Sequence, residues 1–349
     1  LHACFPMVRS ISRQSHARRG SYGKFSGMRN QCIEGDLTLP QGRAFSDNPR
    51  LLFQTQGCAH MPLDYEKLMR TKFEPVRQTY TRRDTMLYAL GLGVATRDPC
   101  DWSELKYVYE KDLVALPTLA VTLAAGAMRL ADPSLGINYR MLLHAEQSLV
   151  MHKPLPVEGT VVSESKIDEI YDKGADKGAV MYMTRTLHDE SNGDLLATMG
   201  TVSFLRADGG FGGKRDGAPK PRPVPSDRPA DIVADLPVFL NQALIYRLAG
   251  DYNPLHSDPE VARSAGFDRP ILHGLCGYGM AGRALLKLLG RDEPARFKRL
   301  DVRFTSPVYP GEPLRIEIWR VGPGDASFRL VATDRNVVVE DFGRFEYSE

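Results

Sequence analysis

The sequence predicts an α+β protein made of two similar halves, each a long helix packed on an antiparallel sheet. Three observations lead to this prediction. Apolar and polar residues alternate with a period of two over several segments, which is typical of strands with one buried face. A run of Gly and Pro interrupts the chain near its middle. Helix-like and strand-like segments follow in the same order on both sides of this run, which indicates an internal repeat.

The composition fits a globular protein of this size. A length of 349 residues corresponds to about two domains. Hydrophobic residues make up 42% and charged residues 25% of the chain, which excludes both general disorder and a membrane bundle. The net charge is only +2, far from the basic excess that binding to nucleic acid requires. We therefore expect no nucleic-acid partner.

Neither a membrane span nor a metal site is expected. The most apolar stretch, residues 113–127, is broken by Pro117 and is shorter than the ~20 residues that a membrane helix needs. The five cysteines show no paired spacing of the kind that binds zinc, and their odd number fits a reducing compartment. The chain ends without the Ser-Lys-Leu signal of many peroxisomal proteins, so we expect a cytoplasmic location.

Residues 1–60 differ from the rest and are expected to form an unfolded extension. Up to Cys32 they contain five Arg and no acidic residue. This composition suggests a transit peptide, although a sustained amphipathic stripe is missing. The alternative is an upstream extension that precedes a start at Met61. We favour the extension because patterned sequence begins directly after that Met.

The Gly and Pro run at residues 207–227 is predicted to be a linker between an N-terminal half, residues 61–206, and a C-terminal half, residues 228–349. Helices are expected at residues 84–92, 118–130, 238–248 and 271–289. Strands are expected at residues 160–167, 179–187 and 195–205, and again at 313–319, 327–333 and 337–347.

Helix boundaries in the C-terminal half locate an irregular segment. Gly250 closes the helix at 238–248, and Asp258 followed by Pro259 caps a short helix that Gly266 ends. Gly290 likewise ends the helix at 271–289. The residues from 251 to 256 must therefore lie between helices.

This segment holds an acid and an imidazole, Asp251 and His256, separated by the turn Asn253-Pro254. The turn can fold both side chains into one cavity, where they could act as a general acid–base pair. Alternatively, Asp251 caps the next turn and His256 is an ordinary loop histidine. The spacing alone leaves both interpretations open.

A glycine-rich helix start follows closely. Free N–H groups at Gly274, aided by the helix dipole, can hold a carbonyl oxygen as it gains negative charge. The alternative is that Gly274, Gly277, Gly279 and Gly282 allow the helix to pack closely, and we expect most of them to do only that.

The stretches Tyr246-Arg-Leu-Ala-Gly-Asp-Tyr-Asn-Pro-Leu-His256 and Phe267-Asp-Arg-Pro-Ile-Leu-His-Gly-Leu-Cys276 resemble the signature of the MaoC-like, or hydratase 2, enoyl-CoA hydratases. This family includes the hydratase 2 part of peroxisomal multifunctional enzyme type 2. The resemblance runs from about Met61 to Tyr347. Further matched blocks are Leu143–Gln147, Lys153–Pro156, Asp172–Gly174, Gly209–Arg215 and Arg303–Gly311.

The resemblance implies a double hot-dog fold with the catalytic residues in the C-terminal half. It implies catalysis by Asp251 and His256, orientation of this pair by Asn253, and polarisation of the thioester carbonyl by the Gly274 amide. The substrate-binding residues it implies are His144, Ala145, Lys173, Asp251, Tyr252, Asn253, Pro254, Leu255, His256, Gly274 and Phe304. The family usually has Gly at the position of Ala145, so one methyl group could lower coenzyme affinity there. Without the resemblance, Lys173 is an ordinary solvated turn lysine.

The function implied is reversible hydration of trans-2-enoyl-CoA to (3R)-3-hydroxyacyl-CoA in fatty acid metabolism. Residues 88–93, the matching part of the N-terminal half, contain neither acid nor His, so that half would hold the acyl chain. No metal and no cofactor is expected, and acyl-CoA is the substrate. The fused chain would be a monomer or a homodimer. Two alternatives stay open: a hot-dog thioesterase or dehydratase acting on acyl carrier protein substrates, and a non-catalytic acyl-CoA binding module.

Overall fold

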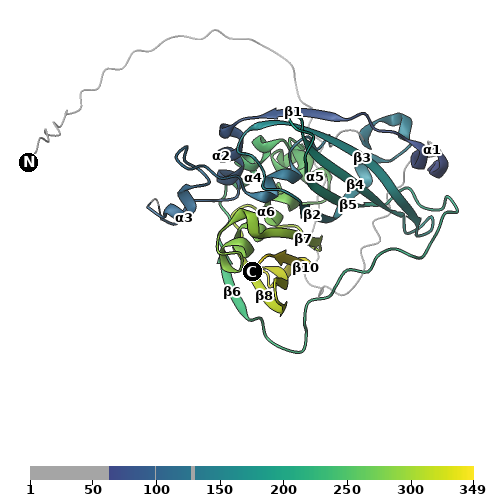
Figure 1. The fold of residues 1–349 in the computed structure, drawn as a ribbon. Helices are drawn as coiled ribbons and strands as arrows, with labels where there is room; N and C mark the ends of the chain where they lie inside the picture. The colour runs from purple at the N-terminus through teal and green to yellow at the C-terminus, as the bar shows by residue number, and fades with distance from the viewer. Residues whose placement is uncertain (1–62, 99, 127–129) are drawn as a thin grey trace, which may run out of the picture. The chain divides into compact units, whose positions relative to one another are not determined.

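A computed structural model describes residues 63–98, 100–126 and 130–349, all within the unit Ala59–Glu349 of the chain (Figure 1). The expectations for residues 1–60 and for a start at Met61 lie outside the described residues. Within the described ranges, no helix is both long and apolar enough to cross a membrane.

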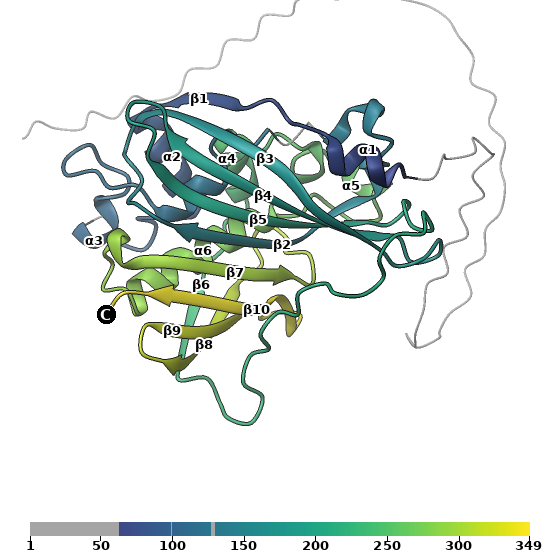
Figure 2. The same cartoon turned by 45° about the vertical axis from the view of Figure 1, so that its right-hand side comes forward.

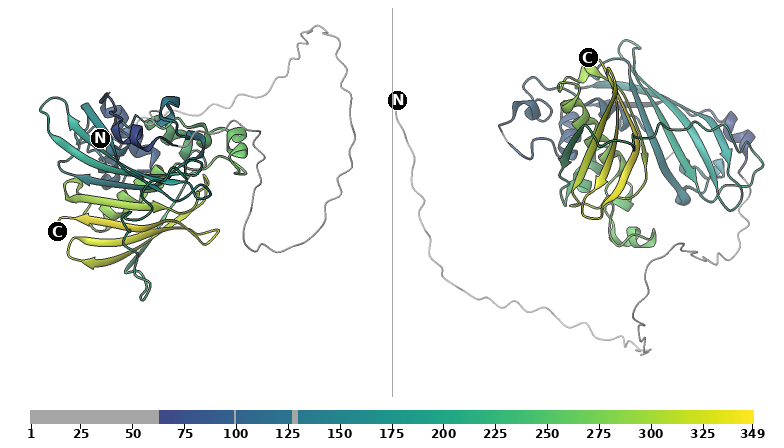
Figure 3. Two further views of the ribbon diagram at one scale, coloured as in Figure 1. Left: turned by 90° about the vertical axis from the view of Figure 1, so that its right-hand side faces the viewer. Right: turned by 90° about the horizontal axis from the view of Figure 1, so that it is seen from below.

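Ten antiparallel strands of the described chain form one sheet. The N-terminal half contributes β1 (Val76–Tyr80), β2 (Leu142–Met151), β3 (Gly159–Asp172), β4 (Ala179–Asp189) and β5 (Leu195–Leu205). The C-terminal half contributes β6 (Ile232–Leu236), β7 (Phe297–Phe304), β8 (Leu314–Gly322), β9 (Asp325–Ala332) and β10 (Val337–Tyr347). Figure 3 shows the sheet as one curved surface that continues from the teal strands of the first half into the yellow strands of the second.

The two halves have the same topology. The order along the sheet is β1-β3-β4-β5-β2-β7-β10-β9-β8-β6, so each half places its second strand at the centre of the whole sheet. There β2 pairs with β7, with Glu146 opposite Arg303 and Val150 opposite Arg299 (Figure 2). The α+β class and the internal repeat predicted from the sequence are confirmed.

Six α-helices of the described chain accompany the sheet. They are α1 (Tyr65–Arg70), α2 (Arg82–Gly91), α3 (Trp102–Leu105), α4 (Gln242–Tyr246), α5 (Pro259–Ser264) and α6 (Gly274–Leu288). In Figure 2, α2, α4 and α6 lie behind the strands, so they cover one face of the sheet. A Cβ atom added at Gly91 would lie 3.0 Å from the Cα atom of Tyr246, so α2 and α4 are in nearly direct backbone contact.

The glycines of α6 allow close packing, as one of the two interpretations of this segment predicted. A Cβ atom at Gly279 would lie 2.6 Å from Leu92, and one at Gly282 would lie 2.7 Å from Thr118. Both neighbours belong to the N-terminal half, so side chains at these two positions would push the halves apart. Tyr278 on the same helix is fully buried and donates its hydroxyl hydrogen to the carbonyl of Leu300 at 2.9 Å.

The helix expected at residues 118–130 does not form over its described part, and this prediction was wrong. A short 3-10 helix, Pro117–Val121, is followed by a turn. The physical reason is a half-buried cation on β4: the guanidinium of Arg185 donates to the carbonyls of Val121 at 2.8 Å and Leu123 at 2.6 Å. These carbonyls are therefore turned towards Arg185 instead of along a helix axis. Over its described residues, the N-terminal half thus has no helix as long as α6.

A buried carboxyl group lies beneath α6. Glu340 of β10 is 3% exposed, and its Oε2 atom has no hydrogen-bond partner among the described residues. Its Oε1 atom would be 2.6 Å from a Cβ atom added at Gly277, so the side chain lies directly against the helix. Burial raises the pKa of Glu340 well above its ordinary value, so the folded protein keeps this group neutral.

Glu340→Met is expected to stabilise the protein, and increasingly so as the pH rises. Above the ordinary glutamate pKa the unfolded chain loses this proton while the folded chain retains it, so wild-type stability falls by up to ~1.4 kcal/mol per pH unit. Met has a similar length and no proton to lose. Urea unfolding from pH 5 to pH 9 measures the difference, with Glu74→Gln at an exposed site as the control. A constant difference between Glu340→Met and wild type would contradict this account.

Candidate active site

The loop from Asp251 to His256 is shaped by its own polar side chains. Gly250 has a φ of +120°, which lets the chain turn sharply after the 3-10 helix Arg247–Ala249. The Asp251 carboxylate accepts the amide hydrogen of Asn253 at 3.2 Å. The Asn253 side chain in turn accepts from the amide of Leu255 at 3.1 Å and caps the 3-10 helix Pro254–His256. As predicted, Gly250 follows the helical segment before this loop, and the side chain of Asp258 caps α5.

His256 is held as a neutral imidazole with a defined tautomer. The side chain is buried, and Nδ1 lies 2.9 Å from the carbonyl oxygen of Ile271. Because a carbonyl can only accept, Nδ1 carries the hydrogen and Nε2 keeps a free lone pair. Burial lowers the pKa of His256, against the opposing effects of this hydrogen bond and of the Asp251 charge. At neutral pH the ring can therefore accept a proton.

The fold brings Asp251 and His256 together, with His273 beside them. One oxygen or nitrogen atom from each of these three side chains lies within 4.8 Å of the others. Such a set could in principle ligate a metal ion. However, the rings of His256 and His273 are stacked, with centroids 3.7 Å apart and planes inclined by 28°. Stacked imidazoles direct their lone pairs side by side and not at a common point, so an acid–base site fits this geometry better.

Gly274 is the first residue of α6, a helix of 15 residues. The first amides of a helix have no acceptor within it, and the helix dipole adds positive potential there. A Cβ atom at Gly274 would lie 3.2 Å from the ring of Phe304, so any larger residue would crowd this helix end. The Gly274 amide follows His273, whose ring is stacked on His256, so this helix start lies beside the acid–histidine pair.

The N-terminal half also contributes to this site. The His144 ring on β2 meets Phe304 of β7 edge-on, with centroids 5.1 Å apart. Burial lowers the pKa of His144, and the Asp251 charge opposes this effect. Burial raises the pKa of Tyr139, and the same carboxylate raises it further. Both groups are therefore within electrostatic range of Asp251.

Two residues of this site were not predicted. His273 precedes the helix-opening Gly274, and that position was a signal in the sequence that could have identified it. Tyr139 lies on a short 3-10 helix, Tyr139–Met141, and has no comparable sequence signal.

Two of the remaining predicted substrate residues, Ala145 and Lys173, lie at surface pockets. Two surface pockets, of about 680 and 510 Å3, share Lys173, Phe204, Arg215 and Asp216 in their walls. Ala145 lines the smaller pocket, and neither pocket is lined by the acid–histidine pair. In the loop from Asp251 to His256, the predicted substrate residues Tyr252, Asn253 and Pro254 are exposed and Leu255 is half-buried.

One buried carboxylate orders the wall of these pockets. Asp172, at the end of β3, accepts from the backbone amides of Gly174 at 2.8 Å, Gly210 at 2.7 Å and Gly212 at 2.7 Å. Burial alone would raise the pKa of Asp172, but these amide hydrogen bonds outweigh it and the pKa is lowered. Next to it, Lys173 donates from Nζ to the carbonyl of Arg215 at 2.6 Å. The first part of the predicted linker is therefore a fixed loop.

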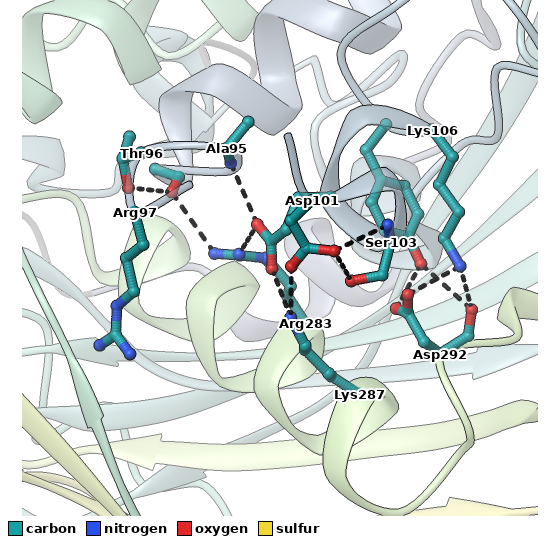
Figure 4. Close-up of polar contacts among 12 residues, drawn as sticks. Ala95, Thr96, Arg97, Asp101, Ser103, Lys106, Arg283, Lys287 and Asp292 are labelled. Carbon is teal, nitrogen blue, oxygen red and sulfur yellow. Dashed lines mark hydrogen bonds and ion pairs between the residues drawn. The ribbon is translucent and has the colours of Figure 1, made fainter. Parts of the chain in front are cut away.

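Charged side chains tie α6 to the N-terminal half (Figure 4). Arg283 forms an ion pair with the buried Glu104, and Lys287 Nζ lies 2.9 Å from the same carboxylate. Beyond the helix, Lys106 Nζ lies 2.7 Å from Asp292. Because the other end of α6 enters the candidate site, this network fixes the helix on which the site depends.

Comparisons with known proteins agree with this architecture. A family model described as the MFE-2 hydratase 2 N-terminal domain matches residues 78–207, and the MaoC like domain matches residues 223–341. "Probable enoyl-CoA hydratase 2" of Dictyostelium discoideum is 41% identical over 277 residues, covering 77% of this chain and 91% of that protein. The crystal structure of a MaoC-like dehydratase from Phytophthora capsici superposes with a TM-score of 0.72 at 35% identity, covering 81% of this chain and 98% of that one.

A third comparison concerns the fold alone. A Mycobacterium tuberculosis protein described as having a double hotdog fold superposes with a TM-score of 0.51 at 15% identity, covering 80% of this chain and 96% of that one. Fold and site together define a double hot-dog protein with one acid–histidine site. The chain belongs to the MaoC-like, hydratase 2 family.

The tautomer of His256 can be tested in solution. Nitrogen-15 NMR of the imidazole rings should show His256 as the neutral Nδ1–H form at pH 7, with a pKa below 6.5, because burial disfavours the charged form. The spectrum of His256→Ala assigns the signal. An Nε2–H tautomer, or a pKa above 6.5, would contradict the geometry described here.

Proposed function

We propose that this protein is a (3R)-specific 2-enoyl-CoA hydratase, a hydro-lyase of fatty acid metabolism. It would add water reversibly to trans-2-enoyl-CoA and form (3R)-3-hydroxyacyl-CoA. The observation that carries the proposal is the pairing of the Asp251 carboxylate with a neutral His256 whose Nε2 is free to accept a proton. The names of the relatives, a hydratase and a dehydratase, support the same reaction in its two directions.

The arrangement suits addition of water across an α,β-unsaturated thioester. A water molecule between Asp251 and His256 can donate one hydrogen to each of them. Its oxygen attacks C3 of the substrate, the pair accepts the proton that this water releases, and the pair then delivers a proton to C2 and returns to its starting state. Negative charge passes to the thioester oxygen, which the Gly274 amide can stabilise. Because the two side chains are adjacent, both would lie on one side of the bound substrate, and both parts of water would reach the same face of the double bond.

This reaction adds one molecule of water and involves no net oxidation or reduction. An acid–base pair and a hydrogen-bond donor meet its needs, so we propose that no metal and no cofactor takes part. Asn253 would act through its hydrogen bonds within the loop, which fix the spacing of Asp251 and His256.

For the substrate, we propose that the coenzyme A part contacts Lys173 and Ala145 at the surface pockets. Cationic side chains such as Lys173 and Arg215 suit its phosphates.

The acyl part would run between the catalytic loop and the N-terminal half. The segment Pro117–Val121, which replaces a long helix there, is buried and mostly apolar. Thr122 directly follows this segment, and its carbonyl oxygen would lie 3.9 Å from a Cβ atom added at Gly250. The segment therefore borders the loop that holds Asp251 and His256.

A homodimer is also proposed. Four large apolar residues, Leu240, Leu244, Leu248 and Tyr252, recur every four positions and are 80%, 52%, 47% and 57% exposed. Leu90, on the neighbouring α2, is 45% exposed as well. Light scattering, compared with the monomer mass of 38.9 kDa, decides between one copy and two.

The cytoplasmic location stays a prediction, which microscopy of the tagged chain would test.

The catalytic pair is tested by substitution. Asp251→Ala and His256→Ala should each lower turnover of trans-2-enoyl-CoA by at least ~100-fold, since each removes a group that handles a proton of the attacking water. Loss of absorbance at the enoyl-thioester band measures the rate, and a (3R)-specific dehydrogenase identifies the product.

The exposed Asp268→Ala and His152→Ala are matched controls that should leave turnover unchanged. Release of free thiol would indicate a thioesterase in place of a hydratase. An unchanged band in the wild type, despite tight acyl-CoA binding, would favour a binding module.

A further inference from the structure

His273 has no part in the reaction described so far, yet it contacts each part of the site. It is 1% exposed and lies at the N-cap position of α6, directly before Gly274. Its ring is stacked on His256 at a centroid separation of 3.7 Å. The ring of Tyr246 is also close, with centroids 5.0 Å apart. An imidazole enclosed this completely has a fixed orientation.

The hydrogen bonds of His273 define its tautomer. Nε2 lies 3.1 Å from the main-chain carbonyl oxygen of Asp251, so Nε2 carries the hydrogen and donates it. Nδ1 then has a lone pair, which is buried and has no partner among the described residues. A buried polar atom without a partner costs stability, and native proteins keep few of them. The retention of a histidine here calls for a functional explanation.

The ring is neutral at physiological pH. The pKa of His273 is lowered to about 4, first by burial and then by the neighbouring His256, while the Asp251 charge and the hydrogen bond to the Asp251 backbone oppose these effects. Arg247 adds a smaller lowering effect, and Tyr246 is the remaining ionisable group in ring contact. Because His273 is neutral, it can stack on His256 without adding a positive charge beside that ring when His256 accepts a proton.

We infer that His273 is a positioning residue of the hydration reaction, holding Asp251 by a hydrogen bond to its backbone and His256 by stacking. The inference rests on the proposed function. Through the peptide bond that follows it, His273 also fixes the amide of Gly274. One side chain thereby sets the relative placement of the acid, the base and the hydrogen-bond donor. A displacement of about 1 Å among such groups can cost ~100-fold in rate.

Two substitutions separate the two contacts. His273→Gln places an amide donor near the position of Nε2 and removes the aromatic face. His273→Phe keeps the face and removes the donor. Each should lower kcat by about 10- to 100-fold and change KM by less than about threefold, because neither contact involves the substrate. His152→Gln, at an exposed histidine in the N-terminal half, is the control and should match wild type.

The outcomes are distinct. If wild type hydrates trans-2-enoyl-CoA and both folded variants retain its kcat within about twofold, the inference is overturned. If wild type is inactive, the proposed function fails instead. If a variant does not fold, nitrogen-15 NMR of the wild-type protein tests the inference instead. Nitrogen-15 NMR should show His273 as the neutral Nε2–H tautomer at pH 7, and an Nδ1–H or charged ring would overturn the inference.

Discussion

The antiparallel pairing of β2 with β7 is the constraint on which the site depends. It joins two sheets of identical strand order into one. At this seam His144 of the first half meets Phe304 of the second, and Phe304 lies against the start of α6. The acid–histidine pair belongs entirely to the second half, but its surroundings come from both. Neither half alone could therefore build this site.

The two halves share a topology and differ in what covers the sheet. The second half has a long helix whose glycines allow contact with the first half and whose ion pairs with Glu104 fix it there. In the first half, Arg185 binds carbonyls that a helix would have used internally. A half-buried cation needs acceptors for its N–H groups, and these carbonyls provide them while the segment takes an irregular course. Under the proposed function, this difference would leave one half to hold the chemistry and the other to enclose the substrate.

Much of this could be predicted from the sequence because local patterns decided it. Strand β5, Leu195–Leu205, falls on its predicted residues, since its local pattern of apolar and polar residues is typical of a strand. The helix expected at 238–248 is shorter, since the Gln242 side chain accepts from the amide of Phe239 at 2.9 Å and the helix begins only there. The error at residues 118–130 has a distant cause, a guanidinium more than 60 positions along the chain. Tyr139 was missed because its importance depends on tertiary contacts, whereas the position of His273 directly before Gly274 was a signal that was not used.

The stereochemical course of the reaction tests the central claim most directly. The claim is that one pair of side chains delivers both parts of a water molecule from one side of the substrate. Hydration of trans-2-enoyl-CoA in deuterium oxide, followed by NMR of the product at early times, locates the deuterium at C2. The account predicts a single deuterium on the same face as the (3R) hydroxyl group. Deuterium on the opposite face, or an equal mixture of both, would show that the proton at C2 comes from a different source.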